Sequence, residues 1–319
     1  MNQPTITIAI PYYERRKYLR RAIDSVLSQT IDRWRLVICD NCSSHDFAEE
    51  LVASLADDRV SYFREPGRVS RAECFNRGIE LAETDLVVLL HDDDELLPGY
   101  CELMLDAAEQ FPTAAAFYCR ARIIGENSRP VVSLRDSLKA ILTGTRSGAT
   151  TLLQGESAVV ALLRANFIYG PSVCYRKSQL VEKKGSAVFD AKHTSGRSGQ
   201  RLSPPFSPKW DQVLDMDLHV RLLMNGEMVV GLRPIAYCYR RHPDQATVEN
   251  LQSMRYFEEE AGLFDELANK AGELGWSQAA KVARQKRVTK MQLLYQCVAN
   301  ALRLRWREAG KHLAFFGRL

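Results

Sequence analysis

A short apolar run at residues 86–90 ends in three consecutive aspartates, Asp92, Asp93 and Asp94. The run has the length and composition of a strand that is buried on both faces, as in a parallel sheet. Carboxylates crowded beyond such a strand repel one another unless a cation lies among them. Open parallel sheets bind ligands at the carboxyl ends of their strands. The triplet therefore predicts a site for a hard divalent ion such as Mg²⁺ or Mn²⁺, with a solvated acidic loop as the alternative.

Strand and helix signals alternate through the first half of the chain. Strands are expected at residues 6–10, 36–39 and 60–63, and the segments between them carry apolar residues at helical spacing. This repetition predicts an α/β fold with a mostly parallel, Rossmann-like sheet flanked by helices. Asp40 and Asp92 follow two of the expected strands, so both should lie at one edge of the sheet.

Two segments rich in Gly, Ser, Arg and Pro interrupt the second half of the chain, at residues 125–150 and 185–209. Both are expected to be loops, and the second either closes over a bound substrate or is a surface insertion. Strand-like pieces at residues 114–119, 228–232 and 235–239 complete the expected sheet.

Beyond about residue 250 the pattern becomes purely helical. We therefore expect a catalytic domain at residues 1–249 and a C-terminal helical extension at residues 250–319. The end of this extension is basic, because residues 281–319 contain ten Lys and Arg against one acid, Glu308. That segment carries a net charge of +9 whereas the whole chain carries +4, so the remainder carries −5.

The basic extension raises two hypotheses. Leu294, Val298 and Leu302 share one helical face, and arginines follow closely. The first hypothesis is peripheral contact with an anionic membrane surface, near lipid-linked acceptors. The second, favoured for the apolar residues, is that they pack on the catalytic domain and leave the basic face in solvent. Nucleic acid is not an expected partner, because the extension contains no recognition motif.

The composition is that of an ordinary soluble globular protein, with 46% hydrophobic and 26% charged residues. No apolar stretch approaches the ~20 residues needed to span a bilayer. The first residues alternate like a strand and lack the plan of a signal peptide. The eight cysteines are scattered, which suits a reducing cytosol. We expect a cytoplasmic protein, at the inner face of the cell membrane if the extension binds lipid.

Five separate motifs, in order, resemble the family 2 glycosyltransferases with the GT-A fold, over roughly residues 5–247. The motifs are Ile10-Pro11-Tyr12-Tyr13 with the helix at residues 22–29, the segment at residues 39–44, Asn76-Arg77-Gly78-Ile79 before the aspartate triplet, Asp215-Met216-Asp217-Leu218, and Tyr239-Arg240-Arg241-His242. The resemblance implies a GT-A catalytic domain that transfers a sugar from a nucleotide donor, most commonly a UDP-sugar. It also suggests a role in cell-surface polysaccharide biosynthesis.

The resemblance assigns roles around the donor nucleotide. Asp40 looks like the residue that hydrogen-bonds the base, and Pro11 and Tyr13 line the same pocket. Asp92 resembles the member of the DxD pair that contacts the ribose.

The resemblance also implies a divalent metal, Mn²⁺ or Mg²⁺, that bridges the diphosphate. Asp94 looks like the metal-binding member of the DxD pair, and Asp93 takes either part. His242 resembles the late histidine that closes over the metal or the diphosphate. A divalent cation would neutralise the charge that develops on the departing nucleoside diphosphate.

The acceptor, a hydroxyl of a glycan or of a lipid-linked glycan, requires a general base. Asp215, at the start of a helix, fits the family's catalytic base, and Asp217 is the second candidate. The family is inverting, so attack opposite the leaving group needs no covalent intermediate. Three residues depart from the family's pattern. Cys42 occupies a position often held by Gly, His91 occupies one often held by an acid, and His45 shifts the usual acid by one position, to Asp46.

Two other functions are weighed against this one. A sugar nucleotidyltransferase also has an α/β sheet and metal-binding aspartates, but it would need a phosphate loop rich in Gly and basic residues after the first strand. Residues 11–14 read Pro-Tyr-Tyr-Glu instead. A non-catalytic nucleotide-binding or scaffold protein on a transferase fold is the second alternative, and the joint presence of the aspartates and His242 argues against it.

Overall fold

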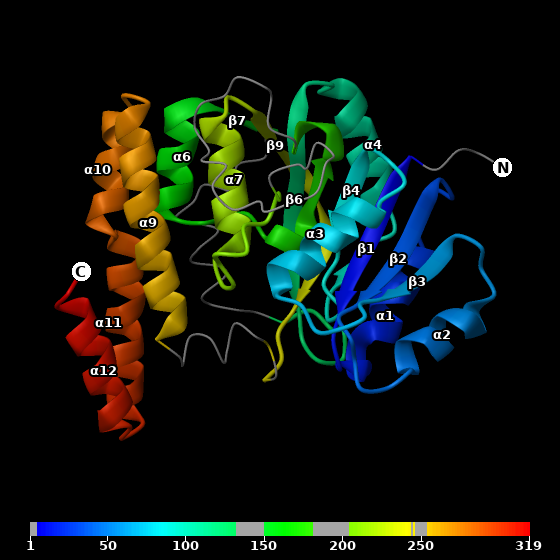
Figure 1. Ribbon diagram of the computed structural model, residues 1–319, viewed down its shortest axis with the longest axis horizontal. Helices are drawn as coiled ribbons and strands as arrows, with labels where there is room; N and C mark the ends of the chain where they lie inside the picture. The colour runs from blue at the N-terminus through cyan, green and yellow to red at the C-terminus, as the bar shows by residue number, and fades with distance from the viewer. Residues whose placement is uncertain (1–4, 132–149, 181–203, 244, 246–253) are drawn as a thin grey trace.

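The computed structural model describes residues 5–131, 150–180, 204–243, 245 and 254–319, which form one mixed sheet covered by helices (Figure 1). The strand order is β3-β2-β1-β4-β8-β6-β9-β5, and β7 pairs with β9. The strands are β1 (Ile6–Tyr12), β2 (Trp34–Asp40), β3 (Val60–Arg64), β4 (Leu86–Leu89), β5 (Glu95–Leu96), β6 (Ala114–Ile124), β7 (Thr151–Leu153), β8 (Val173–Arg176) and β9 (Met228–Arg240).

The amino-terminal half of the sheet is parallel, as the alternation of signals predicts. Strands β3, β2, β1 and β4 pair in parallel, with Ile8 opposite both Leu36 and Val88. The helices of this half are α1 (Arg16–Leu27), α2 (Phe47–Leu55), α3 (Arg71–Leu81) and α4 (Tyr100–Gln110). Helix α3 begins with a capping box between Ser70 and Glu73, which satisfies backbone donors at its first turn. The carboxyl ends of β1, β2 and β4 therefore meet at one edge of the sheet.

The second half of the sheet is mixed. Strand β8 is antiparallel to β4 and β6, β9 is parallel to β6, and β5 and β7 are antiparallel to β9. The strand expected at residues 114–119 continues to Ile124, and the two pieces expected at residues 228–232 and 235–239 form the single strand β9. Pro234 lacks an N–H group, and the register between β6 and β9 shifts there. The chain therefore stays in one strand across that irregularity.

Two hydrophobic cores lie on opposite faces of the sheet. The first joins α3 with α6 (Gly155–Arg164), α7 (Leu214–Met224), α9 (Arg255–Glu273) and α10 (Ser277–Gln285). The second joins α1 and α4 to the other face. The boundary expected between residues 249 and 250 lies outside the described residues, but α9 and α10 share the core of the catalytic part.

The last two helices, α11 (Arg287–Leu302) and α12 (Trp306–Phe316), form a hairpin at the side of the molecule (Figure 1). The favoured expectation that their apolar face packs on the catalytic domain is wrong. Leu294, Val298 and Leu302 are 52%, 51% and 80% exposed. The hairpin packs on the rest of the molecule through other residues, since Leu293 of α11 is buried in a small cluster with Phe257 of α9. No described helix is both long and apolar enough to cross a membrane.

The two expected loops fall largely outside the described residues. Of residues 125–150, the structure describes 125–131 and 150, and of residues 185–209 it describes 204–209. Whether the second of them closes over a substrate is therefore still a prediction.

Candidate active site

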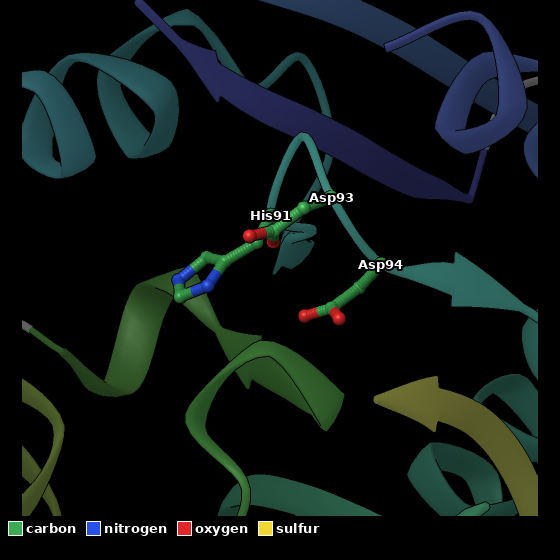
Figure 2. A group of neighbouring side chains, drawn as sticks. All are labelled: His91, Asp93 and Asp94. Atoms are coloured by element: carbon green, nitrogen blue, oxygen red, sulfur yellow. The ribbon is translucent and has the colours of Figure 1, made fainter. Parts of the chain in front are cut away.

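The aspartate triplet lies directly beyond β4, at the edge where a ligand site was expected. Ligand atoms of His91, Asp93 and Asp94 all lie within 4.8 Å of one another, and Figure 2 shows the three side chains gathered beside the loop that follows the strand. Burial lowers the pKa of His91 to about 4, against the opposing charge of Asp93. The imidazole is then neutral at physiological pH, so a ring nitrogen can coordinate a metal. One nitrogen and several carboxylate oxygens are donors that fit a divalent transition metal such as Mn²⁺.

Arg15 holds the first two aspartates of the triplet. Its Nη1 lies 2.9 Å from Oδ1 of Asp92 and 2.7 Å from Oδ2 of Asp93. Burial and the neighbouring charge of Asp93 raise the pKa of Asp92 to about 8, although Arg15 opposes the shift. The acidic cluster therefore already contains one cation, supplied by the loop after β1, and it still carries an excess of acidic groups.

His242 contacts the middle aspartate. Its Nε2 lies 3.0 Å from Oδ2 of Asp93, and its ring packs against Tyr18 at a centroid distance of 4.8 Å. Burial disfavours the charged form of Asp93, but the hydrogen bond from His242 and the charges of His91 and Arg15 lower its pKa. His242 is therefore hydrogen-bonded to one member of the group formed by His91, Asp93 and Asp94.

Asp94, which directly precedes β5, is hydrogen-bonded to β9 through both carboxylate oxygens. Its Oδ1 accepts a hydrogen bond from the backbone N–H of Arg240 at 2.8 Å, and its Oδ2 accepts one from the hydroxyl of Tyr237. Burial and the charge of Asp93 raise the pKa of Asp94 well above its usual value. Both oxygens of Asp94 are engaged by β9, whereas Asp93 is held by the side chains of Arg15 and His242. The assignment of Asp94 as the metal ligand is still a prediction.

The guanidinium of Arg240 forms hydrogen bonds with the backbone around the aspartate triplet. It is fully buried and donates to the backbone oxygens of Asp93 and Gly125, at 2.6 and 2.9 Å, and to Glu95. The ring of Tyr18 lies 4.8 Å below its Cζ. Because the carbonyl of Asp93 is one of its acceptors, Arg240 fixes the backbone of the triplet.

The residues expected to bind the nucleotide lie together at the ends of β1 and β2. Tyr12 pairs with Asp40, and Pro11 with Cys39. Oδ1 of Asp40 accepts from the backbone N–H and the hydroxyl of Ser43, at 2.8 and 2.6 Å. Its Oδ2 accepts from the hydroxyl of Tyr62 at 2.7 Å. These bonds fix the orientation of the carboxylate.

An exposed aromatic ring follows directly on β1. Tyr13 is exposed, and the guanidinium of Arg68 stacks on its ring at 4.2 Å from the centroid. The amide of Asn41 exchanges two hydrogen bonds with the backbone of Val69, at 2.9 and 2.8 Å. These bonds hold the loop after β3, which carries Arg68, against the loop after β2. Cys42, in that second loop, has a φ of +60°, the left-handed region that favours glycine.

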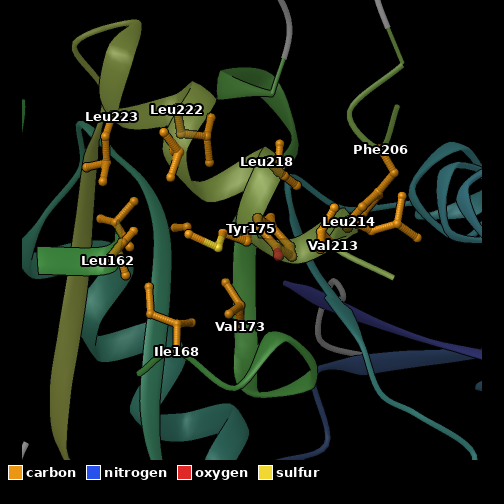
Figure 3. Packing of buried hydrophobic residues seen from close by; sticks show 14 of the residues in the cluster. Leu162, Ile168, Val173, Tyr175, Phe206, Val213, Leu214, Leu218, Leu222 and Leu223 are labelled. Carbon is orange, nitrogen blue, oxygen red and sulfur yellow. The ribbon is translucent and has the colours of Figure 1, made fainter. Parts of the chain in front are cut away.

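The candidate base is the second residue of α7. Leu214, Leu218 and Leu222 seat this helix on the core, and Figure 3 shows Leu214 and Leu218 beside Tyr175. Asp215 is partly exposed, and within the described part of the chain no hydrogen bond or ion pair reaches its carboxylate. Burial raises its pKa to about 6, with Arg71 opposing. A carboxylate in this state is a suitable proton acceptor near neutral pH.

The second candidate for the base is in a different state. Asp217 is buried and pairs with Arg221, whose Nε lies 2.9 Å from Oδ2. This ion pair joins successive turns of α7. The carboxylate of Asp217 is therefore committed to the helix, whereas that of Asp215 is available.

Helix α3 contacts both the aspartate cluster and the segment that leads into α7. Phe75 contacts His91 and Phe206, with ring centroids 5.7 and 5.2 Å apart. Asn76 donates from Nδ2 to the carbonyl of Phe206 at 2.8 Å, and its Oδ1 accepts from the N–H of Phe206 at 2.9 Å. The charge of Arg71, at the start of α3, acts on both His91 and Asp215. Both groups therefore lie near α3, a helix of the parallel half of the fold.

Comparison with known proteins decides the family. Residues 7–165 match the model described as glycosyl transferase family 2. The chain belongs to this family. The putative colanic acid biosynthesis glycosyl transferase WcaA of Escherichia coli is 32% identical over 118 residues, which are 37% of this chain and 42% of the relative. The GalNAc(5)-diNAcBac-PP-undecaprenol beta-1,3-glucosyltransferase of Campylobacter jejuni is 29% identical over 110 residues, 34% of this chain and 35% of the relative.

Solved structures confirm the GT-A fold. Staphylococcus aureus TarS 1–349 in complex with UDP-GlcNAc has a TM-score of 0.60 at 11% identity, covering 98% of this chain and 92% of that one. The Pyrobaculum calidifontis mannosyltransferase PcManGT, in complex with GDP-Man and Mn²⁺, has a TM-score of 0.57 at 14% identity, covering 98% and 86%. The chain spans 42%, 31% and 51% of the length of three curated relatives.

Three residues of this family 2 glycosyltransferase escaped the sequence-based assignment of the site. His91 was noted only as a departure from the family's pattern, although it directly precedes the triplet at the end of a buried strand. Arg15 follows the first strand by three residues, so its position at the same sheet edge could have been inferred. Gly170, which lies against Asp215, gives no local signal, because the contact joins residues 45 positions apart.

Proposed function

We propose that this protein transfers a sugar from a nucleoside-diphosphate donor to a hydroxyl of a glycan or lipid-linked glycan, with inversion at the anomeric carbon. One observation carries the proposal: Asp215, a carboxylate of raised pKa that no other described residue engages, feels the charge of the same arginine, Arg71, as His91 beside the aspartate triplet. A one-step displacement needs a base that takes the proton of the acceptor hydroxyl. It also needs a metal site that neutralises the charge on the departing diphosphate.

We propose that the nucleotide lies on the ends of β1 and β2. The exposed ring of Tyr13 would stack on the base and the fixed carboxylate of Asp40 would accept a hydrogen bond from it, with Pro11 forming part of the wall. A uracil base is the first choice, and the complex of TarS with UDP-GlcNAc supports it. The GDP-Man complex of PcManGT makes guanine the second.

We propose that the cluster beyond β4 binds a divalent metal when the donor is present. His91 and Asp93 offer the donor atoms that β9 does not engage, with Asp94 and His242 beside them, and Asp92 lies toward the ribose. The nitrogen of His91 favours Mn²⁺ over Mg²⁺, because Mg²⁺ strongly prefers oxygen ligands. The bound ion would neutralise charge on the diphosphate as it leaves.

Asp215 would take the proton of the acceptor hydroxyl as that hydroxyl attacks. Its pKa of about 6 keeps most of it ionised at neutral pH, while leaving it basic enough to share the proton. Attack from the face opposite the diphosphate inverts the anomeric carbon in one step. Asp217 cannot serve equally well, because its ion pair with Arg221 would have to break.

The acceptor and the cellular location are part of the same proposal. The relative from Campylobacter jejuni is named for a diphosphoundecaprenol-linked substrate, and WcaA for colanic acid biosynthesis. Both names favour a polysaccharide or a lipid-linked glycan as the product. We propose that the reaction belongs to cell-surface polysaccharide biosynthesis and takes place in the cytoplasm at the inner face of the membrane. Of the alternatives, a nucleotidyltransferase is disfavoured by the family match, and a non-catalytic scaffold by the unengaged Asp215.

Thermal unfolding with nucleotides tests the donor site. UDP, dTDP, GDP and CMP would each be added with Mn²⁺, with Mg²⁺ and with EDTA. We expect one diphosphate to raise Tm in a concentration-dependent way, and EDTA to abolish the rise, because ligand binding to the folded state stabilises it. The Asp93→Asn variant should lose the metal-dependent part, and Asp106→Asn, an exposed site on α4, should keep it. No shift with any nucleotide would contradict the proposal.

A product assay tests the base. Asp215→Asn should keep the nucleotide-dependent rise in Tm and lose about 10²–10⁴ in turnover, the usual contribution of a general base. Unchanged turnover would remove Asp215 from that role.

A further inference from the structure

The hairpin of α11 and α12 carries most of the exposed large apolar side chains of the described residues. They are Met291, Leu294, Tyr295, Val298, Leu302, Leu304, Trp306, Leu313 and Phe316. The first five follow the spacing of one helical face along α11. A contiguous apolar surface of this kind on a soluble protein marks an interaction site, because leaving it in water costs free energy.

The most exposed of these apolar side chains lie at the tip of the hairpin, the turn at residues 302–307 between α11 and α12. Leu302, Leu304 and Trp306 are 80%, 75% and 65% exposed, and the arginines at positions 303, 305 and 307 between and beyond them are exposed as well. Apolar and basic side chains therefore alternate through the turn between the two helices. Tryptophan and arginine are side chains that suit the boundary between lipid headgroups and acyl chains.

The charged residues of the segment at residues 281–319 are almost all basic. No Asp or Glu occurs between Lys281 and Arg307, and residues 281–319 carry +9. Such a surface repels a second copy of itself and attracts a polyanionic one. Nothing acidic within the segment neutralises the arginines of the tip before Glu308.

We infer that the α11–α12 hairpin is a docking surface for a bilayer that contains anionic phospholipid. Leu302, Leu304 and Trp306 enter the interfacial region, and the adjacent arginines contact headgroup phosphates. The apolar face of α11 lies along the lipid surface. The hairpin binds peripherally, because no described helix can span the membrane.

The hairpin tip lies at the same end of the molecule as the candidate site, as a lipid-linked acceptor would require. That acceptor is part of the proposed function, so this step rests on it. In Figure 1 its tip lies at the lower end of the molecule, the end toward which β1 and β9 run. The candidate site follows the carboxyl ends of those strands. A membrane that binds the tip therefore lies on the side of the site, where a lipid-linked acceptor presents its glycan.

Vesicle sedimentation with the full chain tests the inference without any donor or acceptor, so its result is independent of activity. We expect binding to vesicles of phosphatidylcholine with about 30% phosphatidylglycerol, weak binding to pure phosphatidylcholine, and loss of binding as salt screens the charges. Replacing all three tip arginines by Gln should weaken binding on the order of a hundredfold, at about one kcal/mol for each charge. Replacing Leu302, Leu304 and Trp306 by Gln should weaken it at least about tenfold.

A matched control separates local from overall charge. Gln at Lys281, Arg284 and Arg287, three exposed basic residues away from the tip, should change binding by less than about threefold. Circular dichroism and Tm would verify that each variant is folded. Absence of binding to anionic vesicles, or equal losses for tip and control variants, would overturn the inference. A dimer in sedimentation equilibrium that the apolar tip variant abolishes, without vesicle binding, would assign the surface to a second copy instead.

Discussion

The α-carbon of Gly170 lies directly against the carboxylate of Asp215. A Cβ built on Gly170 would stand 2.7 Å from Oδ1 of Asp215 and closer still to Oδ2. Real side chains do not approach so closely, so only glycine at this position leaves the carboxylate where it is. The segment between α6 and β8 therefore positions the proposed base, although it contributes no side chain to the chemistry.

Gly170→Ala should reduce kcat by about ten- to a hundredfold, because the added methyl group displaces the carboxylate by an ångström or so. The nucleotide-dependent rise in Tm should be unchanged, since the donor site is on other elements. Gly272→Ala, where a Cβ meets open space, is the control and should retain full kcat. A Gly170→Ala enzyme with normal turnover would show that Asp215 can act from elsewhere.

The activity should depend on the ionisation of Asp215. Its pKa is raised to about 6, so it is protonated and inactive as a base below that pH and ionised above it. We expect kcat/KM to rise with pH and to level off above about 6. The rising limb should disappear in Asp215→Asn and persist in Asp217→Asn, which should lower Tm through loss of the pair with Arg221. A flat profile between pH 5 and 7 would count against this assignment.

Cys42→Gly should stabilise the protein by roughly 0.5–1 kcal/mol. A side chain in the left-handed region costs about 1–2 kcal/mol, and part of the gain is offset by the greater freedom of glycine in the unfolded chain. Urea unfolding would measure the change. Cys42→Ala removes the thiol but keeps the strained backbone, so it should give no such gain. Equal stabilisation by both variants would show that the thiol, not the backbone, is responsible.

Arg240→Lys should destabilise the protein by about 3 kcal/mol or more. The buried guanidinium satisfies several acceptors at once, and an ammonium group cannot reproduce that geometry. Arg122→Lys, at an exposed position of the neighbouring strand, should change stability by less than about 0.5 kcal/mol. Chemical denaturation of both variants checks the difference, and a small effect at Arg240 would mean that solvent reaches the site.

The parallel half of the fold was predictable because its information is local. Each strand there is a short apolar run followed by a turn and a helix, so strands β1 to β4 and the edge that holds Asp40 and Asp92 follow from periodicity. Strand β8 was not expected: Val173–Arg176 is four residues long, and its place between β4 and β6 depends on pairing with distant residues. The two expected pieces of β9 are one strand, because Pro234 imitates a break.

The sequence predicted which residues belong to the site better than it predicted the contacts between them. Motifs pointed to the triplet, Asp215 and His242, but not to which carboxylate is engaged by its neighbours. Asp94 hydrogen-bonds β9, more than 140 residues away, and Asp93 meets both Arg15 and His242. Such pairings depend on tertiary structure, so no local pattern could have distinguished one aspartate of the triplet from the next.

The amide of Asn76 contacts residue 206 solely through main-chain atoms, giving and receiving one hydrogen bond as a neighbouring strand would. Any amino acid except proline presents the same N–H and C=O at that position. The ring of Phe206 adds a second attachment, because it is buried and packs edge-on against Phe75 of the same helix. The two backbone hydrogen bonds would survive a change of side chain at residue 206, whereas the aromatic contact with Phe75 would not.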